Sequence, residues 1–166
     1  MNGLRLRDFR PADSATLGRL FYDTIHAINP RDYTALQIDA WAPAVPAPGH
    51  WAERARTRHI IVAEHETGVL GFVELRPADS YLDCLYVRHD AQGQGVATAL
   101  VRELEAHART LGICTVGVDA SITARPFFER RGYATIAPQE VEIRGVKLTN
   151  FRMEKTLTAP GAPRPG

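Results

Sequence analysis

Apolar residues along the chain switch between helical and strand-like spacing, and these switches predict its secondary structure. The longest helical pattern covers 95–111, beginning at Gly95 and ending at Gly112, a residue that favours helix ends. An earlier helix follows Asp13, which can cap it, and ends before Pro30. Shorter helices are predicted over 35–41, 51–57 and 123–131.

Short apolar or alternating runs predict a series of strands between these helices. Residues 42–49 contain three prolines and cannot form regular structure. Residues 1–157 are predicted to form a single α/β domain, and 158–166, rich in proline and glycine, a disordered tail. The predicted strands are 4–9, 60–64, 69–75, 80–87, 113–118, 135–143 and 146–155.

Composition narrows the class of protein. The chain has 166 residues, 45% of them hydrophobic and 23% charged, which is typical of a globular domain with a real core. A net charge of +1 argues against a nucleic-acid or membrane surface as partner. We find no signal peptide in the first 20 residues and no apolar run of 18, so we expect a cytoplasmic protein.

The two cysteines, Cys84 and Cys114, do not suggest a disulfide framework. Both lie in apolar runs, and we expect buried, unreactive thiols at both positions. No group of side chains has the spacing of metal ligands, so no metal is expected.

A glycine-rich turn joins the strand 80–87 to the helix 95–111. Free backbone N–H groups at such a helix N-terminus bind phosphate. A P-loop needs Lys and Ser/Thr where Val96 and Ala97 stand, which excludes that class. The dinucleotide fingerprint places Thr98 at its third glycine position and finds an acidic residue, Asp119, in the expected region, so it remains an alternative.

A third pattern, Gln92-x-x-Gly95-x-Ala97, resembles the pyrophosphate loop of the GNAT superfamily, the acetyl-CoA-dependent N-acetyltransferases. A second segment of this chain, 120–133, resembles the late signature of the same family, and the resemblance spans about 3–156. A Rossmann domain would begin with its glycine-loop strand, whereas here that strand lies mid-chain. The residues in register in the second segment are Ser121, Ala124, Phe127, Phe128, Gly132 and Tyr133.

The resemblance implies a mixed, mostly antiparallel sheet of about seven strands, splayed at its centre and flanked by helices. It also implies an enzyme that moves an acetyl group from acetyl-CoA to an amine of a small molecule or peptide, as a monomer or homodimer. The rival class is a non-catalytic acyl-CoA-binding or sensing module. The cofactor contacts implied by the resemblance are Leu85, Tyr86 and Val87 for the pantetheine arm, Gln92, Gly93, Gln94, Gly95, Val96, Ala97 and Thr98 for the pyrophosphate, and Ser121, Phe128 and Arg130.

Deprotonation of the attacking amine needs a base. Asp83, a carboxylate inside an apolar strand, is the first candidate, and Glu74 in the preceding strand is the second. Asp119 is interpreted as a strand-end residue bonded to the turn at Ser121. Many family members carry a tyrosine, poised to protonate the leaving thiolate, where this chain has Phe128, so the general acid is left open between Tyr133, Tyr81 and water.

The acceptor is expected near the insert 31–43, where the sequence resembles a bacterial subgroup of small acetyltransferases with a DY…Q…AWAP pattern. Tyr33 and Trp41 are predicted to line its pocket, although Trp41 can equally be a core residue under the proline-rich loop.

Overall fold

The structure is a computed structural model that describes residues 3–157. The predicted tail at 158–166 therefore lies outside the described residues, and the domain boundary stays a prediction.

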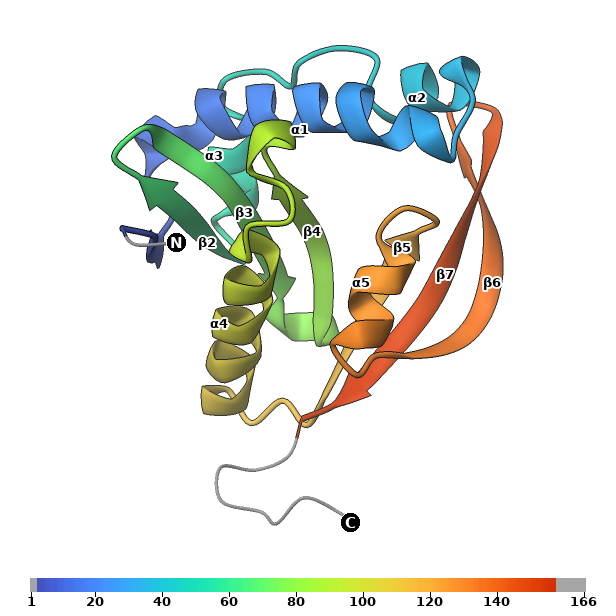
Figure 1. The fold of residues 1–166 in the computed structure, drawn as a ribbon. Helices are drawn as coiled ribbons and strands as arrows, with labels where there is room; N and C mark the ends of the chain where they lie inside the picture. Colours follow the sequence, from blue (N-terminus) through green and yellow to red (C-terminus); the bar gives the residue numbers. More distant parts are fainter. Residues whose placement is uncertain (1–2, 158–166) are drawn as a thin grey trace.

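The described chain has an α/β fold with one mixed sheet and helices on both of its faces, as predicted (Figure 1). The seven strands are ordered β1-β2-β3-β4-β5-β7-β6, and each neighbouring pair is antiparallel except β4 with β5. Pro138 lies in β6, where an edge strand tolerates the missing N–H. The strands are β1 (Arg5–Asp8), β2 (His59–His65), β3 (Gly68–Arg76), β4 (Tyr81–Val87), β5 (Thr115–Ser121), β6 (Ala134–Ile143) and β7 (Val146–Thr156).

The two central strands are paired only at their first residues. Tyr81 of β4 is level with Gly117 of β5, and Leu82 is level with Val118. Beyond these two pairs β4 and β5 diverge, which is visible in Figure 1. The predicted splay at the centre of the sheet is therefore present, and it leaves one edge of β4 without a partner strand.

The helices cover the sheet from two sides. Residues of α4 and α5 share one hydrophobic cluster with β3, β4 and β5, whereas α1 and α3 share another with the opposite face of β2, β3 and β4. The helices are α1 (Ser14–Ile28), α2 (Ala35–Trp41), α3 (His50–Arg54), α4 (Val96–Thr110) and α5 (Arg125–Arg130).

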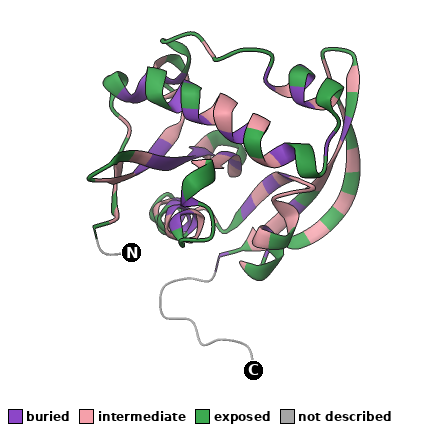
Figure 2. Ribbon diagram, turned by 45° about the horizontal axis from the view of Figure 1, so that its top comes forward, coloured by how far each residue is buried: buried purple, intermediate pink, exposed green. Residues whose placement is uncertain are grey.

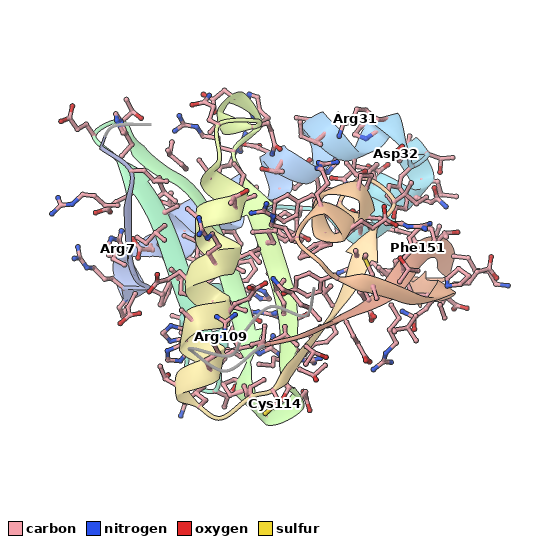
Figure 3. The ribbon with its side chains drawn as sticks, turned by 60° about the horizontal axis from the view of Figure 1, so that its bottom comes forward. Arg7, Arg31, Asp32, Arg109, Cys114 and Phe151 are labelled. Carbon is pink, nitrogen blue, oxygen red and sulfur yellow. The ribbon has the colours of Figure 1, made fainter. Side chains whose placement is uncertain are left out.

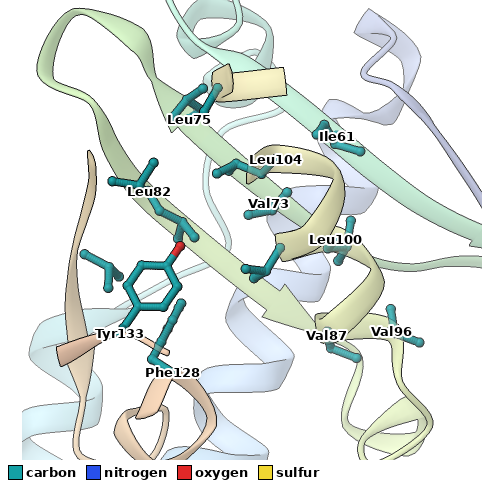
Figure 4. Close-up of a cluster of buried hydrophobic side chains, with 14 of the residues drawn as sticks. Ile61, Val73, Leu75, Leu82, Val87, Val96, Leu100, Leu104, Phe128 and Tyr133 are labelled. Carbon is teal, nitrogen blue, oxygen red and sulfur yellow. The ribbon is translucent and has the colours of Figure 1, made fainter. Parts of the chain in front are cut away.

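The larger cluster fixes the position of α4 against the strands that part. Leu100 and Leu104 of α4 are fully buried, as predicted from their spacing, and Phe128 and Tyr133 belong to the same cluster as Leu82 of β4 (Figure 4). Residues of β6, by contrast, alternate between exposed and partly buried, as Figure 2 shows.

Several details differ from the sequence interpretation. The strand predicted over 113–118 is Thr115–Ser121, so Asp119 lies inside β5 and not at its end. The short helix α3 occupies His50–Arg54, one residue earlier at its start and three residues shorter at its end than predicted. Cys114 is exposed, which corrects the expectation of a buried thiol, whereas Cys84 is buried as expected. The reason is that Cys114 lies in the short connection between the turn at Gly112 and the start of β5 at Thr115, outside the buried strand that was predicted for it.

A β-bulge interrupts β4 where it passes Glu74. Glu74 is level with Cys84 and Leu75 with Leu82, so Asp83 is an extra residue in the strand. The bulge changes the alternation of β4 and lets Asp83 reach Arg54 on the same side of the sheet as Glu74. It also marks the point at which β4 leaves β5.

Candidate active site

A cavity of about 540 Å³ lies where β4 and β5 diverge. Its walls come from β4, the glycine turn, the first turn of α4, the end of β5 and α5, and it is closed from the other side by the end of α1 and by Trp41. Most of the predicted site residues line it, whereas Glu74, Gln94 and Tyr33 do not. Those that do are Asp83, Leu85, Tyr86, Val87, Gln92, Gly93, Gly95, Val96, Ala97, Thr98, Ser121, Phe128, Arg130 and Trp41.

The glycine turn has the backbone that its sequence predicts. Gly93 and Gly95 adopt φ values of 73° and 85°, in the left-handed region that favours glycine. The side-chain amides of Gln92 and Gln94 hold the turn, because they donate to the carbonyl oxygens of Val87 and Asp90 at 2.7 and 3.0 Å, and Gln94 does not line the cavity. Gln94 therefore supports the turn from outside the cavity.

The N-terminus of α4 presents unpaired donors to this cavity. Gly95 occupies the N-cap position and has no side chain to cap the helix. The first bond of the helix runs from the Ala99 N–H to the Gly95 carbonyl at 3.0 Å, so the N–H groups of Val96, Ala97 and Thr98 have no helical partner. These three residues line the cavity, and the helix dipole adds a positive potential there. The arrangement suits an anion such as a phosphate.

The free edge of β4 offers a second recognition element. Residues 83–87 follow the last pair with β5, so their backbone groups on that side lack a strand partner. The carbonyl of Val87 is the exception, since it accepts from the hydroxyl of Thr24 and from Gln92 at 3.2 and 2.7 Å. An extended ligand can add to such an edge by backbone hydrogen bonding.

The far wall of the cavity is formed by β5 and α5. The Ser121 hydroxyl accepts a hydrogen bond from the Ala124 N–H at 3.0 Å and so shapes the turn into α5. Phe128 is 2% exposed and packs edge-on against Phe127 and Tyr133, so it belongs to the core as much as to the cavity. Arg130 lines the cavity, as does Arg131, which the sequence interpretation had not included.

The two candidate bases are both paired with arginines. Both oxygens of Glu74, which is fully buried, accept from Arg54, and Oε1 also accepts from Arg58 at 2.6 Å. Oδ2 of Asp83 accepts from the same two guanidinium groups at 2.8 and 2.6 Å. Cys84 completes the cluster, since its sulfur lies 3.6 Å from Nη2 of Arg54. These bonds engage both oxygens of Glu74 and Oδ2 of Asp83, so each carboxylate is already paired with cations inside the protein.

The two tyrosines considered as general acids lie away from the cavity. The Tyr133 hydroxyl is buried in the core, and the backbone N–H of Asp119 donates to the Tyr81 hydroxyl at 3.1 Å. Burial raises the pKa of both phenols. Neither residue lines the cavity, so a proton on its hydroxyl is not presented to a ligand there.

The rings of Tyr33 and Trp41 lie 5.5 Å apart, but the two residues differ in whether they line the cavity. Trp41 lines the cavity. Tyr33 is 6% exposed, and its hydroxyl donates to the Thr149 carbonyl at 2.7 Å and accepts from the Ile122 N–H at 2.9 Å. Tyr33 therefore ties β7 to the end of β5 behind the cavity wall.

The end of α1 closes the cavity beside α5. Asp32 accepts a hydrogen bond from the Thr123 hydroxyl at 2.7 Å, and Figure 3 shows Arg31 and Asp32 next to α5. Thr24, Ile28, Asn29 and Arg31 line this side, and the sequence interpretation did not include them. Thr24 and Ile28 belong to the helix predicted after Asp13, whereas Asn29 and Arg31 follow its last turn, and nothing in the sequence pattern indicates what they face.

Within residues 3–157, His, Cys, Asp and Glu side chains do not gather in groups of three or more that could hold a metal ion. In the same range, no helix has both the length and the apolar character needed to cross a membrane.

Comparison with known proteins places the chain among acetyltransferases. The model of the family described as "Acetyltransferase (GNAT) domain" matches residues 29–155. The chain is 35% identical over 153 residues to the Escherichia coli (strain K12) protein described as "Uncharacterized N-acetyltransferase YafP", covering 92% of this chain and 96% of that one.

Solved structures share the fold. A GCN5-related N-acetyltransferase from Rhodopseudomonas palustris is similar with a TM-score of 0.88 and 34% identity, over 95% of this chain and 98% of that one. YncA from Salmonella typhimurium, solved with its cofactor acetyl-CoA, has a TM-score of 0.71 and 19% identity over 98% of both chains. PaiA from Thermoplasma acidophilum, solved with coenzyme A, has a TM-score of 0.70 and 15% identity over 92% and 98% of the two chains.

Proposed function

Since the chain belongs to the GNAT acetyltransferase family, we propose that it transfers an acetyl group from acetyl-CoA to a primary amine of a small molecule or peptide. The observation that carries this proposal is the cavity between the diverging strands β4 and β5, which has the free N-terminus of α4 at one end. Such a cavity fits two parts of CoA, its phosphate-bearing end and its extended pantetheine arm.

The residues present fit CoA part by part. The N–H groups from Gly93 to Thr98 suit its pyrophosphate, because those of Val96, Ala97 and Thr98 have no helical partner and stand at a helix N-terminus. The free edge at Leu85–Val87 suits the pantetheine arm, which would add to β4 like a strand. Ser121 and Phe128 lie on the opposite wall, and Arg130 and Arg131 add positive charge for the phosphates. Bound CoA compounds in the YncA and PaiA structures support this choice of ligand.

The acceptor would enter from the side of α1 and α2. Trp41 and Tyr86 offer apolar surface there, and the pKa of Tyr86 is raised well above its usual value, chiefly by burial. The phenol therefore stays neutral and does not repel or attract a charged acceptor. A small aliphatic or aromatic amine matches these walls, and membership of the DY…Q…AWAP subgroup stays a prediction.

Acetyl transfer to a panel of small amines and peptides tests the proposal, with acetylated product measured by mass spectrometry. Detection of released CoA with a thiol reagent would be confounded by the exposed thiol of Cys114, so a Cys114→Ser variant is the matched control. Calorimetric titration with acetyl-CoA and with NAD accompanies the assay. Tight binding of acetyl-CoA without turnover on any amine would favour the sensing module, and tighter binding of NAD would overturn the proposed ligand.

A further inference from the structure

The carboxylate of Asp119 lies at the apex of the split in the sheet. Val118, its neighbour, is the last residue of β5 that pairs with β4, through Leu82. Asp119 is therefore the first residue of β5 beyond that pairing, and it lines the cavity. Its Oδ1 atom is shielded from solvent and has no hydrogen-bond partner among the described residues. The expected bond from the Asp119 carboxylate to the turn at Ser121 is not found among the described residues, and the Ser121 hydroxyl accepts from the Ala124 N–H instead.

Asp119 and Asp83 are the carboxylates among the described residues that line the cavity, and their surroundings differ. Asp83 accepts from Arg54 and Arg58, so its charge is compensated inside the protein. Asp119 makes no ion pair within 4.0 Å that the structure shows, although Arg152 of β7 is level with it in the sheet. Arg152 is exposed and directed to Glu154 at 3.9 Å.

Tyr81 is the group that shares the environment of Asp119 most closely. Its hydroxyl accepts from the Asp119 N–H, which fixes the backbone at the apex. Burial raises the pKa of Tyr81 most, and the negative charge of Asp119 and a hydrogen bond with its side chain raise it further, so it is Oδ1 of Asp119 that stays without a partner. Arg76 lies over the Tyr81 ring at 4.5 Å and is the cation that approaches this group from β3. The Tyr81 phenol is thus held neutral beside the Asp119 side chain.

A shielded carboxylate oxygen without a partner is costly, and a positively charged ligand removes that cost. The ammonium form of an amine is such a ligand, and its N–H groups supply the missing donors. We propose that Asp119 binds the ammonium group of the acceptor amine and takes its first proton, an inference that rests on the proposed function. The base is thus assigned to β5 rather than to Asp83 or Glu74.

One proton passes from the ammonium nitrogen to the Asp119 carboxylate, which leaves a neutral amine with a free electron pair. This nitrogen forms a bond to the thioester carbonyl carbon, and the carbon–sulfur bond then breaks with its electron pair going to sulfur. A second proton leaves the nitrogen and is taken up by the thiolate, and Asp119 returns its proton to solvent. The products are the acetylated amine and free CoA.

Asp119→Asn tests the assignment, with Asp83→Asn as comparison and Glu154→Gln as matched control. Glu154 is level with Gly117 and shares the face of Asp119 one strand away, but it does not line the cavity. In Asp119→Asn we expect kcat/KM for the amine to fall by about 10²–10⁴-fold and the acidic limb of its pH profile to disappear. The Kd for acetyl-CoA should change by less than about twofold, since a tenfold change would correspond to about 1.4 kcal/mol of binding free energy. The control should retain rate and profile.

The outcomes separate this inference from the proposed function. If the wild-type protein transfers acetyl and Asp119→Asn keeps both rate and acidic limb, Asp119 is not the base and the inference fails alone. If Asp83→Asn loses the limb while remaining folded, the role returns to Asp83 and the inference also fails. If the wild type acetylates no amine, it is the proposed function that fails. Should Asp119→Asn not fold, rescue of Asp119→Ser by added formate decides: restored turnover supports the assignment, and its absence overturns it.

Discussion

Arg54 holds the carboxylate of Glu74 with two parallel hydrogen bonds, from Nε to Oε2 at 2.8 Å and from Nη2 to Oε1 at 2.5 Å. Glu74 is fully buried, so this pairing compensates a charge that has no access to water. The sequence suggested Glu74 as a candidate base, and the geometry instead gives it the environment of a structural ion pair.

Arg54→Met should therefore destabilise the fold. Breaking a buried ion pair costs about 3–5 kcal/mol, and we expect the lower end because Arg58 still contacts Glu74. The melting temperature should fall by about 6–12 °C. Arg56→Met is the control, since Arg56 forms an exposed pair with Glu53 and should change stability by less than about 0.5 kcal/mol. Equal melting temperatures for the two variants would contradict the structural role.

Substitutions at Gly95 test the proposed role of the glycine turn in binding phosphate. We expect both Gly95→Val and Gly95→Ala to weaken acetyl-CoA binding by about tenfold or more, about 1.4 kcal/mol. A Cβ at Gly95 would meet nothing within 4 Å, so the reason is the φ of 85°, which side chains disfavour. Gly49→Ala is the matched control, because Gly49 also has open space but a φ of −86°. Calorimetry on the three variants distinguishes backbone conformation from bulk: unchanged affinity in Gly95→Ala would make bulk the cause.

Tyr33 and Trp41 should respond differently to substitution. Tyr33→Phe removes the hydroxyl between Thr149 and Ile122 and should cost about 1–3 kcal/mol of stability without changing the KM for the amine. Trp41→Ala should raise that KM and leave the Kd for acetyl-CoA nearly unchanged. Amine kinetics and thermal unfolding on both variants provide the check. A raised amine KM in Tyr33→Phe at unchanged stability would return Tyr33 to the pocket.

Phe128→Tyr asks whether transfer needs a dedicated acid. A thiolate has a pKa near 8.5, so its protonation near neutral pH is almost thermoneutral, and a phenol with a pKa near 10 is a weak donor to it. We expect kcat to change by less than about tenfold, under ~1.4 kcal/mol of barrier. Turnover rates on one good acceptor settle this. A nearly inactive wild type rescued by the hydroxyl would favour the sensing module.

His59 should make stability depend on pH. Burial, and then the charge of His107 stacked on it at 3.7 Å, lower the pKa of His59 below its usual value of 6.5. The unfolded chain therefore binds this proton at a higher pH than the native state does. Stability is lost as pH falls through about 6.5 towards the lowered value. Urea unfolding at about pH 7.5 and 5.5 should show a smaller loss in His59→Gln than in the wild type, and an equal loss would argue against His59.

Local patterns carried most of the fold prediction. The turn at Gly93 and Gly95 and the buried face of α4 depend on residues close together in sequence, so spacing and residue type were enough. Cys114 was predicted wrongly because an apolar run does not show where the strand begins.

The candidate site was harder to predict where its contacts are distant in sequence. Arg54 and Glu74 are separated by 20 positions and Tyr33 and Thr149 by 116. A charge or an aromatic ring does not specify its partner across the fold. The bulge that brings Asp83 to the arginines depends on the pairing of two strands and has no signal in the sequence of either.

The pairing of β4 with β5 at Tyr81–Gly117 and Leu82–Val118 alone also has a mechanical consequence. The sheet consists of two leaves, β1–β4 and β5–β7, joined in the sheet by a short hinge, and opening between the leaves breaks few hydrogen bonds. A ligand lying along β4 takes the place of the missing strand contacts. We therefore expect a ligand bound along β4 to stiffen the sheet, and its release to leave the two leaves freer to move relative to one another.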